Sequence, residues 1–120
     1  MDSTTTIKDL QEKIQKFCED RDWDQYHGAK DLAIGIITEA SELLENFRFK
    51  SEKEVEEILN SDKMKEISGE MADILFFILR LSQKYDIDLT EALNKSIEKN
   101  NERYPIHKAK GSNKKYTELD

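Results

Sequence analysis

The stretch 67-ISGEMADILFFILRL-81 decides the fold of this chain, because it is apolar around most of a helix and still carries two acids three residues apart. A second stretch, 32-LAIGIITEASELLENF-47, has a similar composition, and two of its acids have the same spacing. Side chains three residues apart lie on one side of a helix, so each pair of carboxylates projects together. The four acids are Glu39, Glu42, Glu70 and Asp73.

Hydrophobic periodicity predicts four main helices joined by short links, and no segment shows the alternating pattern of a strand. The helices are expected at residues 6–21, 30–47, 64–84 and 88–104, with a short extra helix at 51–59. Ser51 followed by Glu54 forms a capping-box pattern that begins the short helix, and Pro105 ends the last main helix. The predicted fold class is all-α, an antiparallel four-helix bundle with a short extra helix and a C-terminal tail.

The positions of the apolar residues predict which helix faces are buried. In the second main helix, the predicted core stripe is Ala33, Ile36, Ile37, Ala40, Leu43, Leu44 and Phe47. The third main helix is apolar on nearly every side between Met71 and Leu81, so we expect it to be covered all round. If these two helices pack antiparallel, the two acid pairs can meet.

Length and composition indicate one domain and exclude one class of function. The 120 residues are expected to form a helical domain over 1–105 and a polar tail over 106–120. The net charge of −7 argues against a protein that binds DNA or RNA polymers, because such proteins carry clustered Lys and Arg. A nucleotide ligand stays compatible with this charge, since bound metal ions can reverse the local sign.

The same sequence predicts a cytoplasmic protein without a membrane contact. Cys18 is the single cysteine, so no internal disulfide can form, which fits a reducing compartment. The first ten residues contain no apolar leader segment. The longest apolar run, 74-ILFFIL-79, is far too short to cross a bilayer.

Carboxylates set among core-forming residues need an explanation, because burying each one without a partner costs several kcal/mol. Protonation, pairing with Lys or Arg, or a bound cation would relieve this cost, and exposure to solvent is the alternative. No Lys or Arg lies between Glu66 and Leu79, which weakens the case for pairing within the third helix. Oxygen ligands without Cys or a nearby His suit Mg²⁺ or Mn²⁺.

At this point the chain resembles a known family. The pattern Glu-x-x-Glu, a gap of 27 residues and Glu-x-x-Asp is similar to the metal motif of the MazG-like superfamily of all-α nucleoside triphosphate pyrophosphohydrolases. The similarity is greatest to the dCTP pyrophosphatase branch of that superfamily. Five segments resemble that branch in the same order: 20-DRDWDQYH-27, 39-EASELLENFRFK-50, 70-EMADILFFI-78, 100-NNERYP-105 and 115-KYTEL-119.

The resemblance implies Mg²⁺-dependent hydrolysis of dCTP, or of a related or modified deoxynucleotide, to the monophosphate and pyrophosphate. It implies that the four acids hold the magnesium and act as the catalytic residues; Mn²⁺ is the alternative metal. It also implies a set of substrate-binding residues, which are Trp23, His27, Lys30, Phe49, Phe77, Lys95, Asn100, Arg103 and Tyr104.

Three positions depart from the branch. Phe49 stands where the branch often has Trp, and Phe77 stands where it has Tyr. Ser96 stands where the family usually has Lys, and Lys95 is one residue early. The preferred base and sugar, the number of metal ions and the acid that activates water therefore stay open at this point.

Two further expectations concern the class of function and the assembly. The alternative to an enzyme is a non-catalytic helical module that binds a nucleotide or a protein on the same fold, and the complete set of four acids favours the enzyme. The third helix has more apolar surface than one chain can cover, so we expect part of this surface to be buried between chains. With the resemblance, it implies a homo-tetramer built as a dimer of dimers, with a dimer as the alternative. In that assembly, Trp23, His27 or the 106–120 tail is expected to reach a neighbouring chain's acids.

Overall fold

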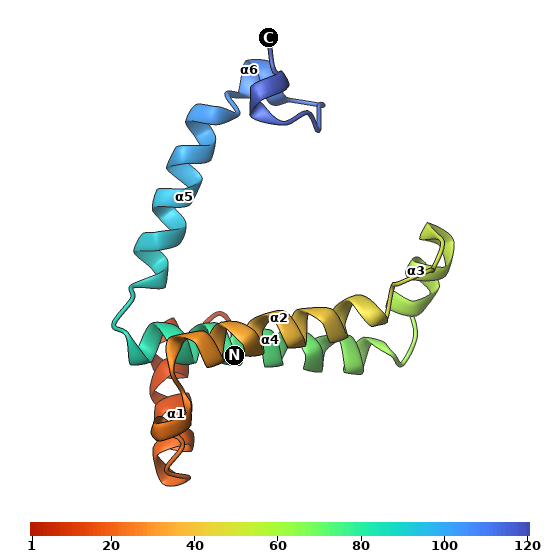
Figure 1. The fold of residues 1–120 in the computed structure, drawn as a ribbon. Helices are drawn as coiled ribbons and strands as arrows, with labels where there is room; N and C mark the ends of the chain where they lie inside the picture. The colour runs from red at the N-terminus through yellow and green to blue at the C-terminus, as the bar shows by residue number, and fades with distance from the viewer. The chain divides into compact units, whose positions relative to one another are not determined.

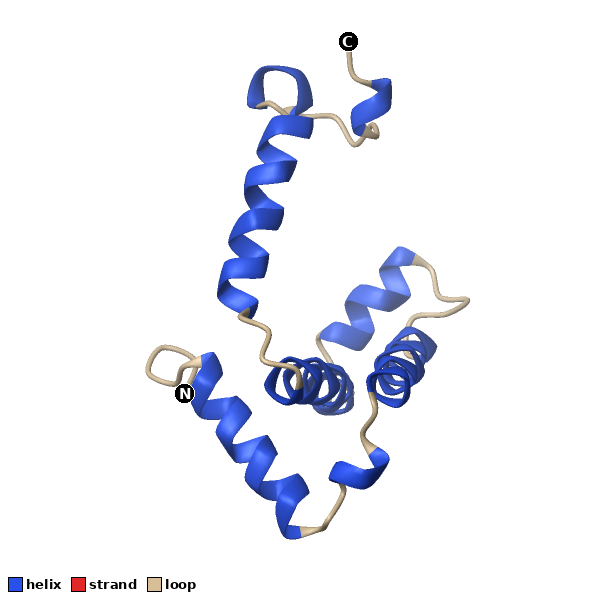
Figure 2. Ribbon diagram, turned by 60° about the vertical axis from the view of Figure 1, so that its left-hand side comes forward, coloured by secondary structure: helices blue, strands red, loops and turns tan.

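All 120 residues are described in the computed structural model, which consists of helices and links without any strand (Figures 1 and 2). The chain forms two compact units, Met1–Asp86 and Ile87–Asp120. The absence of strands agrees with the predicted all-α class. No helix combines the length and the apolar character that crossing a membrane would require.

The first unit contains four α-helices and one short 3-10 helix. They are α1 (Ile7–Asp20), the 3-10 helix Asp24–Tyr26, α2 (Ala29–Glu45), α3 (Glu52–Leu59) and α4 (Met64–Lys84). The predicted helix bounds agree with these within two residues. At the start of α3, Ser51 Oγ accepts a hydrogen bond from the backbone N–H of Glu54, and the Glu54 carboxylate accepts one from the backbone N–H of Ser51, so the predicted capping box is confirmed.

Helices α2 and α4 lie side by side and run antiparallel, as the colour gradient in Figure 1 shows. Helix α1 packs against α4, where Gln11 Nε2 donates to the buried Ser82 Oγ at 2.8 Å. The buried apolar residues come from all three helices: Cys18, Leu32, Ile67 and Leu79.

A glycine allows close packing between α2 and α4. A Cβ atom on Gly35 would lie 2.6 Å from ring carbons of Phe77, which is well inside van der Waals contact. The missing side chain at this position therefore makes room for the Phe77 ring against α2. Phe77 lies one helical turn after Asp73, so this contact also fixes the face of α4 that meets α2.

The predicted core stripe of α2 is wrong at four positions. Ile37 is 69% exposed and Leu44 is 57% exposed, and Ala33 and Ala40 are exposed as well. The face that is covered in the chain is rotated relative to the predicted one: its members are Leu32, Gly35, Ile36, Glu39, Leu43 and Phe47. Helix α2 has apolar residues on two adjoining faces, so its pattern alone could not select the face that meets α4.

The expectation that α4 is covered all round is confirmed only for its second half. There Leu79, Arg80 and Ser82 are buried, because α1 packs against α4. In the first half, Met71 is 57% exposed and Leu75 is 45% exposed. A single chain therefore leaves one side of the first half of α4 uncovered.

The second unit contains α5 (Leu89–Arg103), α6 (Ile106–Ala109) and a 3-10 turn at Tyr116–Glu118. The Asp88 carboxylate accepts from the backbone N–H of Glu91 at 2.8 Å and begins α5, as the sequence predicted. The residues after α5 fold back on its end, because the Tyr116 ring packs edge-on against Tyr104 at 6.0 Å.

Candidate functional site

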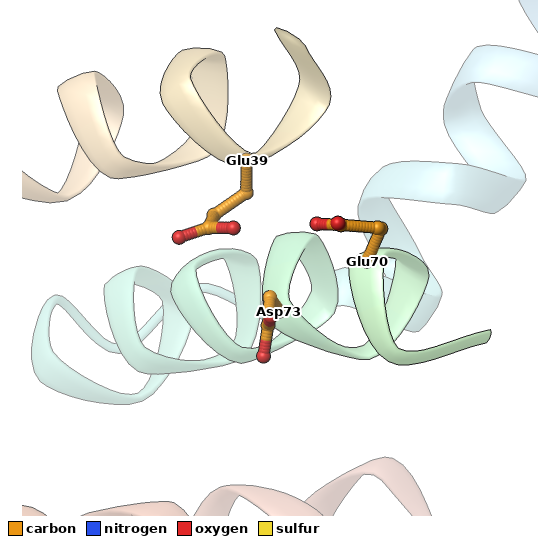
Figure 3. A group of neighbouring side chains, drawn as sticks. All are labelled: Glu39, Glu70 and Asp73. Atoms are coloured by element: carbon orange, nitrogen blue, oxygen red, sulfur yellow. The ribbon is translucent and has the colours of Figure 1, made fainter. Parts of the chain in front are cut away.

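The acid pairs of α2 and α4 meet between the two helices. One carboxylate oxygen from each of Glu39, Glu70 and Asp73 lies within 4.8 Å of the others (Figure 3). Glu39 projects from α2 toward α4, whereas Glu70 and Asp73 project from successive turns of α4. The antiparallel packing predicted from the sequence is what brings together acids that are separated by about thirty residues in the chain.

Two of these carboxylates each have an oxygen that is closed to solvent and lacks a hydrogen-bond donor, Glu39 Oε2 and Glu70 Oε2. None of the four acids forms an ion pair: the ion pairs of the chain involve Asp20, Glu45, Asp24 and Glu91. Buried polar atoms are nearly always satisfied, so two orphaned oxygens facing one space indicate a missing positive partner.

Mutual repulsion and burial raise the pKa of two acids. The pKa of Glu39 is raised chiefly by its interaction with the Glu42 carboxyl, then by burial and by the charges of the other acids. The pKa of Glu70 is raised chiefly by burial, then by the charge of Glu42. Glu42 itself is exposed and outside the group of three, but it is close enough to act on both neighbours.

This donor set fits a hard divalent cation. It consists of carboxylate oxygens alone, it has a high density of negative charge, and two of its oxygens have no other partner. No His lies in the group, and no Cys, which disfavours the softer transition metals. Protonation is the remaining way to relieve the repulsion, and a cation would compete with it.

The connection between α1 and α2 is fixed by the end of α4. Trp23 packs edge-on against Phe17 of α1 at 5.5 Å and against His27 at 5.9 Å. The buried Arg80 donates from Nε to His27 Nδ1 at 3.0 Å and also contacts the Asp24 carboxylate. Lys84 donates to the backbone carbonyls of Asp24 and His27.

The other predicted substrate residues of the first unit differ in exposure. Phe49 is 90% exposed and has a φ angle of 62°, a left-handed conformation that costs energy for a large residue. The Arg48 guanidinium lies 4.7 Å from the centre of its ring. Phe77 is half-buried against Gly35, and Lys30 is exposed at the start of α2.

The predicted residues of the second unit are placed on α5 or at its end. Lys95 pairs with Glu91 at 2.7 Å on the helix surface, and Asn100 is exposed. Arg103 lies over the Tyr116 ring at 4.6 Å from its centre, and Tyr104 packs against the same ring. Arg103 and Tyr104 therefore hold the end of the tail within their own unit.

Sequence reasoning missed Arg80 and Gly35. Arg80 is the single cation within the apolar run of α4, seven residues after Asp73 and so on nearly the same side of the helix. A charged residue in such a position is a signal for a buried partner. Gly35 is a lone glycine inside a helix, which is unfavourable by propensity and indicates a close approach by another element.

These features define a class of protein, an all-α domain with a cluster of acids between two antiparallel helices. The chain belongs to the MazG-like family, whose model matches residues 34–119. It is similar to dCTP pyrophosphatase 1 of Homo sapiens and of Rattus norvegicus, each 30% identical over 115 residues that cover 95% of this chain and 68% of the relative. The same enzyme of Bos taurus is 30% identical over 98% of this chain and 70% of the relative.

A solved structure shares the fold. The crystal structure of a pyrophosphatase from Archaeoglobus fulgidus matches with a TM-score of 0.78 and 36% identity, covering 82% of this chain and 92% of that chain. The predicted family and the predicted all-α fold of this type are therefore confirmed.

Proposed function

We propose that this chain hydrolyses a deoxynucleoside triphosphate, dCTP or a related or modified nucleotide, to the monophosphate and pyrophosphate with Mg²⁺ held by its acids. The enzyme class, a nucleoside triphosphate pyrophosphohydrolase, rests on the curated relatives and on the solved pyrophosphatase. The observation that carries the metal-dependent part is the convergence of Glu39, Glu70 and Asp73 with two orphaned carboxylate oxygens.

In this reaction the acids of α2 and α4 would have two tasks. Glu39, Glu70 and Asp73, with Glu42 at the rim, would hold the cation in a fixed position between two packed helices. A carboxylate of the same group would orient the attacking water and accept its proton. A bound divalent cation supplies positive charge for the phosphate oxygens, which this acidic site otherwise lacks.

The aromatic residues would bind the nucleoside. Phe49 offers a ring face that is free of other side chains apart from Arg48, and its strained backbone keeps that ring out of the core. Trp23 and His27 lie on a connection that is held by Arg80 and Lys84, so they form a second, more rigid surface. Lys30, Phe77, Lys95, Asn100, Arg103 and Tyr104 remain proposed contacts on the strength of the resemblance.

The proposed reaction is tested by measuring pyrophosphate and monophosphate from a panel of canonical and modified nucleotides, with Mg²⁺, with Mn²⁺ and with a chelator. We expect equal amounts of the two products from at least one deoxynucleotide, and no turnover with the chelator. Release of inorganic phosphate instead would contradict the reaction type. Nucleotide binding without any turnover would support the non-catalytic module.

Replacing Phe49 by Ala should raise KM about tenfold and change kcat little, because base stacking, worth 1–3 kcal/mol, is made equally in the ground state and the transition state. Steady-state kinetics on the best substrate of the panel measure both constants. Phe47→Ala is the matched control for ring removal, since Phe47 belongs to the covered face of α2. Loss of the Phe47 ring should lower the stability of the fold and leave KM unchanged. An unchanged KM in Phe49→Ala would remove this ring from the base site.

We also propose that the chain assembles as a homo-tetramer, with a dimer as the alternative. The supporting observation is the uncovered apolar surface of the first unit, formed by residues at helical spacing on α2 and on the first half of α4. Its large members are Ile34, Ile37, Leu44, Met71 and Leu75, which are all between 45% and 69% exposed. A single soluble chain seldom leaves so many large apolar residues of two neighbouring helices in water.

Light scattering should give a mass about four times the 14.1 kDa of one chain. Ile37→Glu should lower this mass, because a charge buried between chains costs several kcal/mol. Thr38→Glu adds the same charge to the neighbouring position outside this apolar face and should leave the mass unchanged. A mass of 14.1 kDa for the unaltered protein would show that the apolar surface has no partner chain.

A further inference from the structure

Arg80 is buried to 1% exposure, and all three of its nitrogen positions have an acceptor. Nε donates to His27 Nδ1 at 3.0 Å, Nη1 donates to Gln83 Oε1 at 2.6 Å, and Nη2 contacts the Asp24 carboxylate. Two of the three acceptors belong to the connection between α1 and α2, and the third belongs to α4 itself. Arg80 therefore links α4 to the connection and not to the acids.

The contact with His27 fixes where the imidazole carries its proton. A guanidinium group donates hydrogen bonds and cannot accept them, so Nδ1 of His27 must be the unprotonated nitrogen. In the neutral ring the proton then lies on Nε2, which has no partner within the chain. The connection thus presents one free N–H donor at a defined position.

The same contact opposes a second proton on the ring. A proton on Nδ1 would break the hydrogen bond from Arg80 and would place two cations face to face. Burial, Arg80 and Lys84 all lower the pKa of His27, in that order, while the carboxylates of Asp24 and Asp31 oppose them. These are the charged groups that face the ring, and their balance favours the neutral form.

We propose that Arg80 is a positioning residue that holds His27 as its neutral Nε2–H tautomer, so that the ring gives the nucleotide a fixed hydrogen-bond donor and not a positive charge. The inference rests on the proposed function, in which His27 contacts the nucleotide. Arg80 follows Asp73 by two helical turns, about 10 Å along α4. With the phosphates at the acids, the donor lies toward the nucleoside, where an uncharged acceptor such as a base carbonyl is available.

Substitution of Arg80 can separate this role from a purely structural one. Asp24 is 53% exposed, so its carboxylate can be hydrated after Arg80 is removed. Removing one partner of an ion pair is costly when the charge left behind stays buried, and the exposed carboxylate of Asp24 avoids that cost. We therefore expect Arg80→Met to fold, with its main effect on the chemistry of His27.

Ring-nitrogen NMR of the nucleotide-free protein between pH 5 and 8 is the first measurement. In the unaltered protein we expect His27 as the Nε2–H tautomer with a titration midpoint below 6.5, the usual value. In Arg80→Met the midpoint should rise, because one of the nearby cations is removed, and both tautomers should appear. Arg80→Lys keeps a positive charge near the ring, so its midpoint should be lower than that of Arg80→Met. Lys lacks the planar guanidinium group, so both tautomers should still appear.

Gln83→Ala is the matched control, because it leaves a buried N–H of Arg80 without a partner but keeps the contact with His27. It should lower stability and leave the tautomer unchanged. An Nδ1–H tautomer in the unaltered protein, or an unchanged ring in Arg80→Met, would overturn the proposal.

Kinetics give the second measurement. Arg80→Met should raise KM about tenfold, as expected for one misplaced hydrogen bond, and should make KM depend on pH over the range in which His27 titrates, with kcat changed little. An unchanged KM together with an altered ring would overturn the role toward the nucleotide. If the proposed function itself were wrong, the unaltered protein would release no pyrophosphate. The NMR result on His27 would be the same in that case, so the two failures can be told apart.

Discussion

Glu70→Gln should lower turnover by at least about a hundredfold while the helical content of the protein is preserved. Gln has nearly the same size as Glu, so α2 and α4 should still pack, but the charge that faces Glu39 is lost. A hundredfold loss corresponds to about 2.7 kcal/mol of transition-state stabilisation, the size found when one electrostatic contact of an active site is removed. Steady-state pyrophosphate release and far-ultraviolet circular dichroism measure the two properties.

Glu66→Gln provides the matched control, because Glu66 lies one turn earlier on α4 and is exposed. It should retain turnover within about threefold, as expected for a surface substitution. Ala substitution of Glu39, Glu42 or Asp73 should cause losses like that of Glu70→Gln. Near-normal turnover in Glu70→Gln would be incompatible with a cation held by this group.

Magnesium should raise the melting temperature by about 10 °C at pH 7 when its concentration is a hundred times its dissociation constant. Such an excess stabilises the folded protein by about 2.7 kcal/mol, and a chain of this size gains a few degrees per kcal/mol. The cation is expected to bind the folded protein and not the unfolded chain, because the acids with the two orphaned oxygens come together only on folding. Differential scanning fluorimetry with and without a chelator measures the shift.

The pH dependence without metal has a definite sign. The pKa values of Glu39 and Glu70 are raised above the ordinary value of 4.5, so the folded protein binds more protons than the unfolded chain. Their contribution to stability is fully present below pH 4.5 and is lost as the pH rises through the raised pKa values. The metal-free protein therefore carries an unrelieved penalty at neutral pH.

The comparison of Glu70→Gln with the unaltered protein isolates this contribution from the other titrating groups. Without metal at pH 7, Glu70→Gln should melt higher than the unaltered protein, and the difference should shrink toward pH 5. With Mg²⁺ the order should reverse, because the variant binds the cation weakly. If Mg²⁺ raised the melting temperature of both proteins equally, the cation would not be held by Glu70 and its neighbours.

Much of the fold could be predicted because the signals for helices are local. The Ser51–Glu54 capping box, the Asp88 cap and the apolar periodicity each act within one or two turns, and the structure has them where the sequence placed them. The burial of α2 could not be predicted in the same way. Ile37 and Leu44 are as apolar as Leu32 and Leu43, so only contact with α4 distinguishes the two sets.

The candidate site also combines features that depend on local sequence with features that depend on the packing of helices. The spacing within each acid pair is a local property, and it places both carboxylates of a pair on one side of a helix. The closeness of Glu39 and Glu70 depends on the register of α2 against α4, which the contact of Gly35 with Phe77 helps to set. The lone glycine indicates a close approach by some element, but its sequence context does not show that the element is α4 or that the contact is Phe77.

The sequence by itself determined the helices, their caps and the two acid pairs, because these depend on residues a few positions apart. Only the tertiary structure decided that Glu39 and Glu70 share one space and that Arg80 fixes His27, which lies 53 residues away in the chain. The physical reason is that a buried charge takes its partner from whichever element packs beside it. That choice depends on helix register, which no local pattern encodes.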